Sequence, residues 1–186
     1  NTALLAICFF LIASIYSSVG FGGGSSYLAL LALPLFSLLP EEIRPIALMC
    51  NIIVVTSGSI IFYREGKIVF KEVWPFLIFS VPMAYVGGFW KLGHQSFFII
   101  LGITLIIASF FLWIQPEEFA TKQKQKNYLS LNVLLGGGIG FLSGLVSIGG
   151  GIFLSPVLHL MRWSEPKKIS ALASLFILVN SISGLA

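Results

Sequence analysis

Long apolar segments without a charged residue fill most of this chain, and they constrain its fold more than any other feature. Hydrophobic residues make up 57% of the 186 residues, charged residues make up only 10%, and the mean hydropathy is +0.99. Soluble domains carry about 25% charged residues, and a soluble monomer of this length could not bury so much apolar surface. The composition excludes a soluble enzyme, a disordered chain and a nucleic-acid-binding protein, and it predicts a membrane protein.

Eight apolar segments lie between the charged residues and the glycine or proline breaks. The segments are continuous rather than alternating, and within lipid a helix satisfies all of its own backbone amides, so we predict an all-α polytopic protein. A helix needs about 20 residues to cross roughly 30 Å of hydrocarbon, and the second and seventh segments are shorter. The segments are residues 1–19, 24–39, 45–63, 73–90, 95–114, 128–146, 150–161 and 169–186.

The distribution of Lys and Arg predicts how these segments are oriented. If the chain changes side at every segment, nine of these residues fall in loops 64–72, 115–127 and 162–168, and only Arg44 and Lys91 fall on the other side. Cytoplasmic loops are rich in Lys and Arg, so we predict that these three loops are cytoplasmic and that the N-terminus is outside.

The same count indicates that the chain reverses at each of two triple glycines. If the first two segments are merged into one crossing, and likewise the sixth and seventh, six Lys and Arg residues fall on one side of the membrane and five on the other. The bias is then lost. A re-entrant hairpin and two full crossings have the same parity, so both remain open.

An internal repeat surrounds the triple glycines. The sequence VGFGGG at 19–24 matches VSIGGG at 146–151 at an offset of 127. After the loss of one residue, an offset of 126 pairs Pro40 with Pro166 and Ala47 with Ala173. A co-linear set of matches over about 40 residues predicts two related units.

The number of segments in the first unit makes the repeat an inverted one. Residues 1–114 hold five segments, and because five is odd, the second unit enters the membrane upside down. We predict a basic linker at 115–127 and a second repeat at 128–186 that holds only its first three segments. Inverted repeats with broken helices are typical of secondary transporters, which bind substrate near the midplane.

Each triple glycine is expected to break a helix and to create an anion-binding helix start. Glycine costs about 1 kcal/mol relative to alanine in a helix, and the next helix would begin with unpaired N–H groups at its positive end. An anion can bind there, and two such ends could hold a small oxyanion between them. The alternative role is close helix packing. The predicted binding residues are Gly22, Gly23, Gly24, Ser25, Ser26, Asn51, Gly149, Gly150 and Gly151, with Ser17, Ser18, Ser143 and Ser147 as nearby hydroxyl donors.

The other polar residues argue against catalysis. All seven Glu are expected in loops and the chain has no Asp, although proton-coupled pumps usually carry an intramembrane carboxylate or histidine. We expect His159 to be packed or interfacial, and Cys8 and Cys50 to be small buried apolar side chains. Two histidines and two cysteines assemble no metal site or nucleophile–base pair. Ser25 occupies the third glycine position of a dinucleotide motif, so we expect no cofactor and no enzyme.

The segments GFGGGSSYLALLALP and SIGGGIFLSP, each followed by a loop and an apolar helix ending in Ser-Gly, resemble the two halves of the TauE/SafE sulfite exporter family, also called TSUP permeases. The resemblance implies a cell-membrane protein that moves sulfite, sulfoacetate or related organosulfur anions. The chain departs from the family motif at Ala29, where proline is expected, and at Ser147, where glycine is expected. The motif positions it implies are Gly20, Gly22, Gly23, Gly24, Gly149, Gly150, Gly151 and Pro156.

From the breaks and the resemblance together we expect a secondary transporter that exports small sulfur-containing anions through a midplane site formed by the two breaks. A negative interior expels an anion with about 2.3 kcal/mol per charge per 100 mV, so export needs no proton relay. A Na⁺- or H⁺-coupled importer of the same anions, and a membrane scaffold or receptor without transport, are the alternatives. The expected partners are a small sulfur oxyanion and membrane lipid, not nucleic acid, and a homo-oligomer is left open.

Overall fold

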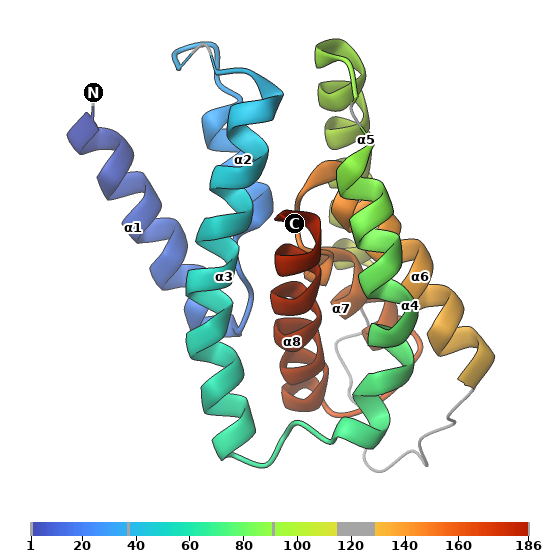
Figure 1. The fold of residues 1–186 in the computed structure, drawn as a ribbon. Coiled ribbons are helices and arrows are strands. Elements are labelled where there is room, and N and C mark those ends of the chain that lie inside the picture. The colour runs from blue at the N-terminus through green and yellow to red at the C-terminus, as the bar shows by residue number, and fades with distance from the viewer. Residues whose placement is uncertain (1, 37, 91, 115–128, 186) are drawn as a thin grey trace.

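The computed structural model describes residues 2–36, 38–90, 92–114 and 129–185, and over these residues it is built from helices without a strand (Figure 1). The predicted basic linker, 115–127, lies outside the described residues. Among the described residues, four helices, α3, α4, α6 and α8, are long and apolar enough to cross a membrane. The helices are α1 Thr2–Val19, α2 Gly24–Leu31, α3 Pro40–Arg64, α4 Phe70–Phe89, α5 His94–Trp113, α6 Leu129–Val146, α7 Gly151–Leu160 and α8 Pro166–Leu185.

The chain reverses direction at both triple glycines. After the first break α2 returns to the end where α1 began, and after the second break α7 returns to the end where α6 began (Figure 1). Helices α2 and α7 have 8 and 10 residues, which at 1.5 Å per residue makes them about 12 and 15 Å long. Because a bilayer core is about 30 Å thick, each hairpin has a short second arm and is re-entrant in form.

The two hairpins enter from opposite ends of the molecule. The α3–α4 and α7–α8 connections lie together at the lower end of Figure 1, which we call the basic end. The α2–α3 and α4–α5 connections lie at the upper end, called here the opposite end. The described cations at or next to the basic end are Arg64, Lys67, Lys71, Arg162, Lys167 and Lys168.

Helix α3 begins earlier than the sequence predicted, and this changes the position of Arg44. The prediction started the segment at residue 45, but Pro40 occupies the first helical position, where its missing N–H costs nothing. The Glu42 carboxylate accepts a hydrogen bond of 3.0 Å from the Leu39 N–H. Arg44 therefore lies within a helix and not in a loop. Glu41, Glu42 and Glu72, also predicted in loops, belong to the first turns of α3 and α4.

Glycines hold α4 and α6 in direct contact. Gly136, Gly140 and Gly144 are four residues apart, so they share one face of α6, and they lie against α4. A Cβ added to Gly140 would be 2.7 Å from the Cα of Ser80. Small residues allow such close approach between membrane helices.

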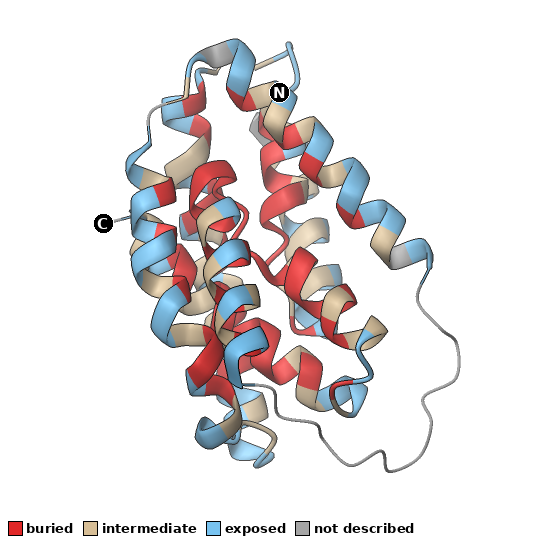
Figure 2. Cartoon of the chain, turned by 90° about the vertical axis from the view of Figure 1, so that its right-hand side faces the viewer, coloured by how far each residue is buried: buried red, intermediate tan, exposed pale blue. Residues whose placement is uncertain are grey.

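Burial is concentrated inside the helix assembly, and apolar side chains cover much of its outside. Figure 2 shows the buried residues gathered around the middle of the molecule and exposed ones along the outer helix faces. Phe10, Ile53, Ile106 and Leu134 are each at least 70% exposed. Apolar faces of this extent are expected to contact lipid.

Candidate functional site

The two glycine breaks have matching left-handed residues. Gly23 and Gly150 precede α2 and α7 with φ values of 77° and 82°. At the start of each break, Gly20 has φ 83° and Ser147 has φ 61°. Ser147, the departure from the glycine motif, therefore adopts the same region as glycine. This conformation costs a non-glycine residue about 1–2 kcal/mol.

Each break ends in a helix start with the same hydrogen bonds. The Gly23 carbonyl accepts the N–H groups of Ser26 and Tyr27, both at 3.0 Å. The Gly150 carbonyl accepts those of Phe153 and Leu154, at 3.1 and 3.0 Å. The N–H groups at the very start of a helix have no acceptor within it, and they lie at its positive end.

Asn51 of α3 lies between the two breaks. Its Nδ2 donates a hydrogen bond of 2.9 Å to the carbonyl of Ile148 in the second break. Its Oδ1 lies against Gly22 of the first break and has no hydrogen-bond partner in the described part of the chain. A Cβ on Gly24 would be 2.8 Å from the same Ile148 oxygen. The breaks are therefore adjacent, and one fully buried amide contacts both.

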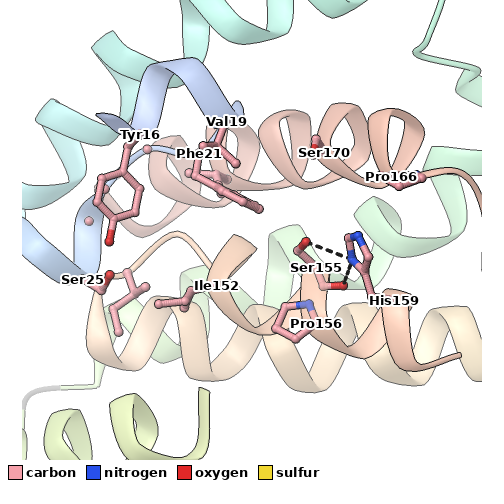
Figure 3. A pocket seen from close by; sticks show the side chains of 15 residues that line it. Tyr16, Val19, Phe21, Ser25, Ile152, Ser155, Pro156, His159, Pro166 and Ser170 are labelled. Atoms are coloured by element: carbon pink, nitrogen blue, oxygen red, sulfur yellow. Dashed lines mark hydrogen bonds between the residues drawn. The ribbon is translucent and has the colours of Figure 1, made fainter. Parts of the chain in front are cut away.

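A cavity of about 480 Å³ extends from the breaks to the start of α8. Figure 3 shows Tyr16 and Ser25 at one end of the cavity and His159 and Pro166 at the other. Because the α7–α8 connection is at the basic end, the cavity extends toward that end. The residues that line it are Tyr16, Val19, Phe21, Gly22, Gly23, Gly24, Ser25, Ile148, Ile152, Ser155, Pro156, His159, Pro166, Ser170 and Ile177.

The polar groups of the cavity are neutral hydroxyls and one histidine, and none of its described lining residues is a carboxylate. The Tyr16 hydroxyl and Ser26 Oγ are 2.8 Å apart, a hydrogen bond that joins α1 to α2. His159 Nδ1 lies 2.7 Å from the Ser155 carbonyl oxygen, one turn earlier in α7 (Figure 3). His159 is thus packed against its own helix.

Only part of the predicted set lines the cavity. Gly22, Gly23, Gly24 and Ser25 do, whereas Ser26 is turned toward Tyr16 and Asn51 is buried behind the breaks. The glycines of the second break are covered by α8.

Two contacts show why the second break is covered. A Cβ on Gly149 would be 2.7 Å from Ile177, and one on Gly150 would be 2.7 Å from Phe176. Ile148 of the second break and Ile152 in the first turn of α7 line the cavity in place of these glycines.

Sequence reasoning missed several polar residues of this region. Tyr16, Ser155 and Ser170 line the cavity. Two serines beside the second break, Ser143 and Ser181, have buried hydroxyls without a partner in the described part of the chain. Ser143 was among the predicted donors, but Ser181 was not.

Comparison with known proteins decides the family. The sequence model of the family described as "Sulfite exporter TauE/SafE" matches residues 5–186. The chain belongs to the TauE/SafE family. This TauE/SafE protein is 33% identical over 188 residues to the probable membrane transporter protein y4hK of Sinorhizobium fredii (strain NBRC 101917 / NGR234), an alignment covering 97% of this chain and 74% of the relative.

A second relative of the TauE/SafE protein is more distant. The probable membrane transporter protein YunE of Bacillus subtilis (strain 168) is 22% identical over 206 residues, covering 97% of this chain and 76% of the relative. No solved structure matches the chain. The family match confirms the resemblance seen in the glycine motifs, and it makes the chain a membrane-embedded transporter of the TauE/SafE type.

Proposed function

We propose that this TauE/SafE protein exports small sulfur-containing anions and binds them where the two glycine breaks meet. The observation that carries the proposal is a cavity at the start of α2, beside the start of α7, whose described lining residues include no carboxylate. Both starts direct their positive helix ends toward the same region, and Ser25 adds a hydroxyl donor in the first turn of α2. An oxyanion docked there would satisfy amides that otherwise lack acceptors.

The size and walls of the cavity favour an organic sulfonate over bare sulfite. Its volume of about 480 Å³ falls in the range of roughly 300–1,000 Å³ typical of small-organic-ligand pockets. Val19, Phe21, Ile152 and Pro156 give it apolar walls. These walls suit a short carbon chain, as in sulfoacetate, while the charged group reaches the helix starts.

The direction of transport follows from the predicted orientation. With the basic end in the cytoplasm, the cavity opens to the inside and loads from there. The membrane potential then drives the anion outward.

Flux in proteoliposomes tests the proposal with a matched pair of variants. Ser25→Asp places a carboxylate at the start of α2, where it is favourable for the helix but occupies the position of the anion. We expect sulfoacetate flux to fall at least tenfold while the protein remains folded. Ser164→Asp makes the same change in the α7–α8 connection, outside the cavity lining, and should keep full flux. Wild-type liposomes that move neither sulfoacetate nor sulfite, or an active Ser25→Asp variant, would reject the proposal.

A cation-coupled importer is the second candidate. Three buried oxygen atoms near the breaks, Asn51 Oδ1, Ser143 Oγ and Ser181 Oγ, have no hydrogen-bond partner in the described part of the chain. Oxygen atoms of this kind could bind Na⁺, as at broken helices of other transporters. Uptake that depends on an inward Na⁺ gradient would favour import over export. Family membership weighs against a scaffold without transport.

A further inference from the structure

A second cavity lies at the opposite end of the molecule, between α3, α4 and α8. It has a volume of about 380 Å³, and Arg44 of α3 and Gly88 of α4 are among its lining residues. A smaller hollow of about 170 Å³ is also lined by Arg44 and Gly88, and it extends to Ser147 in the second break. Arg44 therefore links the opposite end to the glycine breaks.

The guanidinium of Arg44 uses only part of its hydrogen-bonding capacity. Nε donates to Ser147 Oγ at 2.9 Å, and Nη2 donates to the carbonyls of Gly88 and Gly144 at 3.0 and 3.2 Å. A guanidinium has five N–H groups, so the two on Nη1 are left. Within the described part of the chain Nη1 has no hydrogen bond and Arg44 has no ion pair, although Glu41 lines the same cavity.

The partners of Arg44 leave its positive charge available. Both carbonyls belong to the last turns of α4 and α6, and Phe97 of α5 lies 6.0 Å away from the guanidinium carbon. None of these groups carries a full charge, and Glu41, the carboxylate among the described lining residues, makes no ion pair with Arg44. The two free N–H groups of Nη1 point in different directions, and each can donate a charge-assisted hydrogen bond to an oxygen of a sulfonate or a carboxylate.

The repeat relates this position to the main cavity. The offset of 126 pairs Arg44 with Ser170 of α8, and Ser170 lines the 480 Å³ cavity. Equivalent positions of the two repeats thus face cavities on opposite sides of the breaks. An anion that leaves the breaks away from the basic end would meet Arg44.

We propose that Arg44 forms a second anion-binding site, which receives the transported anion on the side of the glycine breaks opposite to the main cavity. The site rests on the proposed function for its place in the transport path. Its ligand is a small organic oxyanion held by the two free N–H groups of Nη1. The competing explanation is that Arg44 only caps the ends of α4 and α6.

Chemical protection tests the site without changing Arg44. The chain has three arginines, Arg44, Arg64 and Arg162, so the Arg64→Lys/Arg162→Lys protein keeps Arg44 as its single target for phenylglyoxal. The purified protein is treated with and without sodium sulfoacetate, with sodium chloride at equal ionic strength as the control, and the mass of the peptide that contains Arg44 measures the modification. Sulfite is avoided because it reacts with the reagent.

We expect sulfoacetate to slow modification of Arg44 at least threefold relative to chloride, and to do so also when Ser25→Asp is added. Equal rates in sulfoacetate and chloride would overturn the second site. Flux without protection would leave the proposed function standing and reject this site. Protection without flux would reject the proposed function and leave Arg44 as an anion-binding site.

Sided kinetics provide a second readout. In proteoliposomes, Arg44→Gln should raise the half-saturating sulfoacetate concentration at least tenfold when substrate is added at the opposite end, and less than twofold at the basic end. Arg44→Lys keeps the charge but loses the planar guanidinium. Its half-saturating concentration at the opposite end should lie between those of the wild type and Arg44→Gln. Arg64→Gln removes the same charge from the far end of α3 and should change neither value. Equal changes at both ends for Arg44→Gln would indicate capping alone and overturn the proposal. If Arg44→Gln does not fold, the protection result decides.

Discussion

The Asn51 side chain donates a hydrogen bond of 2.9 Å to the carbonyl oxygen of Ile148, which lies 97 residues later in the chain. The other atom of the same amide, Oδ1, lies against Gly22. Asn51 is completely buried, so this contact is shielded from water. One side chain of α3 therefore links the two glycine breaks.

Replacing Asn51 should destabilise the protein and impair transport together. Asn51→Leu has a similar volume but leaves the buried Ile148 oxygen without a donor, which costs about 1–3 kcal/mol. We expect a lower midpoint of thermal unfolding in detergent and reduced flux. Thr56→Val is the control, because Thr56 donates only to Ile52 one turn earlier in α3. If both variants unfold at the same temperature, the Asn51 hydrogen bond does not hold the breaks together.

Ser147 allows the backbone strain of the second break to be measured. Ser147→Gly and Ser147→Ala both remove the hydroxyl that accepts from Arg44 Nε, but only alanine keeps a Cβ at φ 61°. The left-handed conformation is unfavourable for alanine, while glycine loses more entropy on folding. The net expectation is that Ser147→Gly is more stable than Ser147→Ala by about 1 kcal/mol. Thermal unfolding of the pair checks the sign, and a more stable alanine variant would contradict it.

Two neighbouring glycines of α6 should respond to alanine with opposite signs. A Cβ on Gly140 would be 2.7 Å from backbone and side-chain atoms of Ser80, whereas a Cβ on Gly138 has no neighbour within 4 Å. Gly140→Ala should destabilise by about 1–3 kcal/mol through overpacking. Gly138→Ala should stabilise by about 0.5–1 kcal/mol through helix preference. Temperature-dependent aggregation of the two detergent-purified variants separates them, and a shared direction would argue against direct contact of α4 and α6.

Cysteine labelling tests the orientation. In a Cys8→Ala/Cys50→Ala background, Gly93→Cys places a thiol at the opposite end and Glu65→Cys places one at the basic end, and both positions are exposed. We expect a membrane-impermeant maleimide added to intact cells to label the first variant only. Labelling of the Glu65→Cys variant alone would reverse the orientation, and with it the direction of loading.

Much of the fold could be predicted because hydropathy and glycine act locally. The apolar runs placed each of the eight helices of the described residues, and Gly23 and Gly150 end the breaks as expected of residues that tolerate positive φ. The start of α3 was misplaced because Arg44 was taken to exclude a helix. Pro40 and Glu42 supply a stronger local signal for the helix start.

The candidate site could be predicted only in part, because its walls depend on tertiary packing. The glycines of both breaks look alike in sequence, yet Ile177 and Phe176 of α8 cover the second set. Asn51 was chosen for its position after the first break, but its hydrogen bond to Ile148 comes from the meeting of two distant hairpins. Spacing along the chain carries no information about such a meeting.

The glycine face of α6 has a mechanical consequence. Where two backbones touch without intervening side chains, a shift of either helix along its axis would force a Cα into a carbonyl, as at Gly144 and Ala84. Helices α4 and α6 should therefore move together as one rigid body. If the protein alternates between inward- and outward-open shapes, the sliding surfaces must lie elsewhere. Most described side chains of α1 are exposed, so little packing holds α1 in place against α4 and α6.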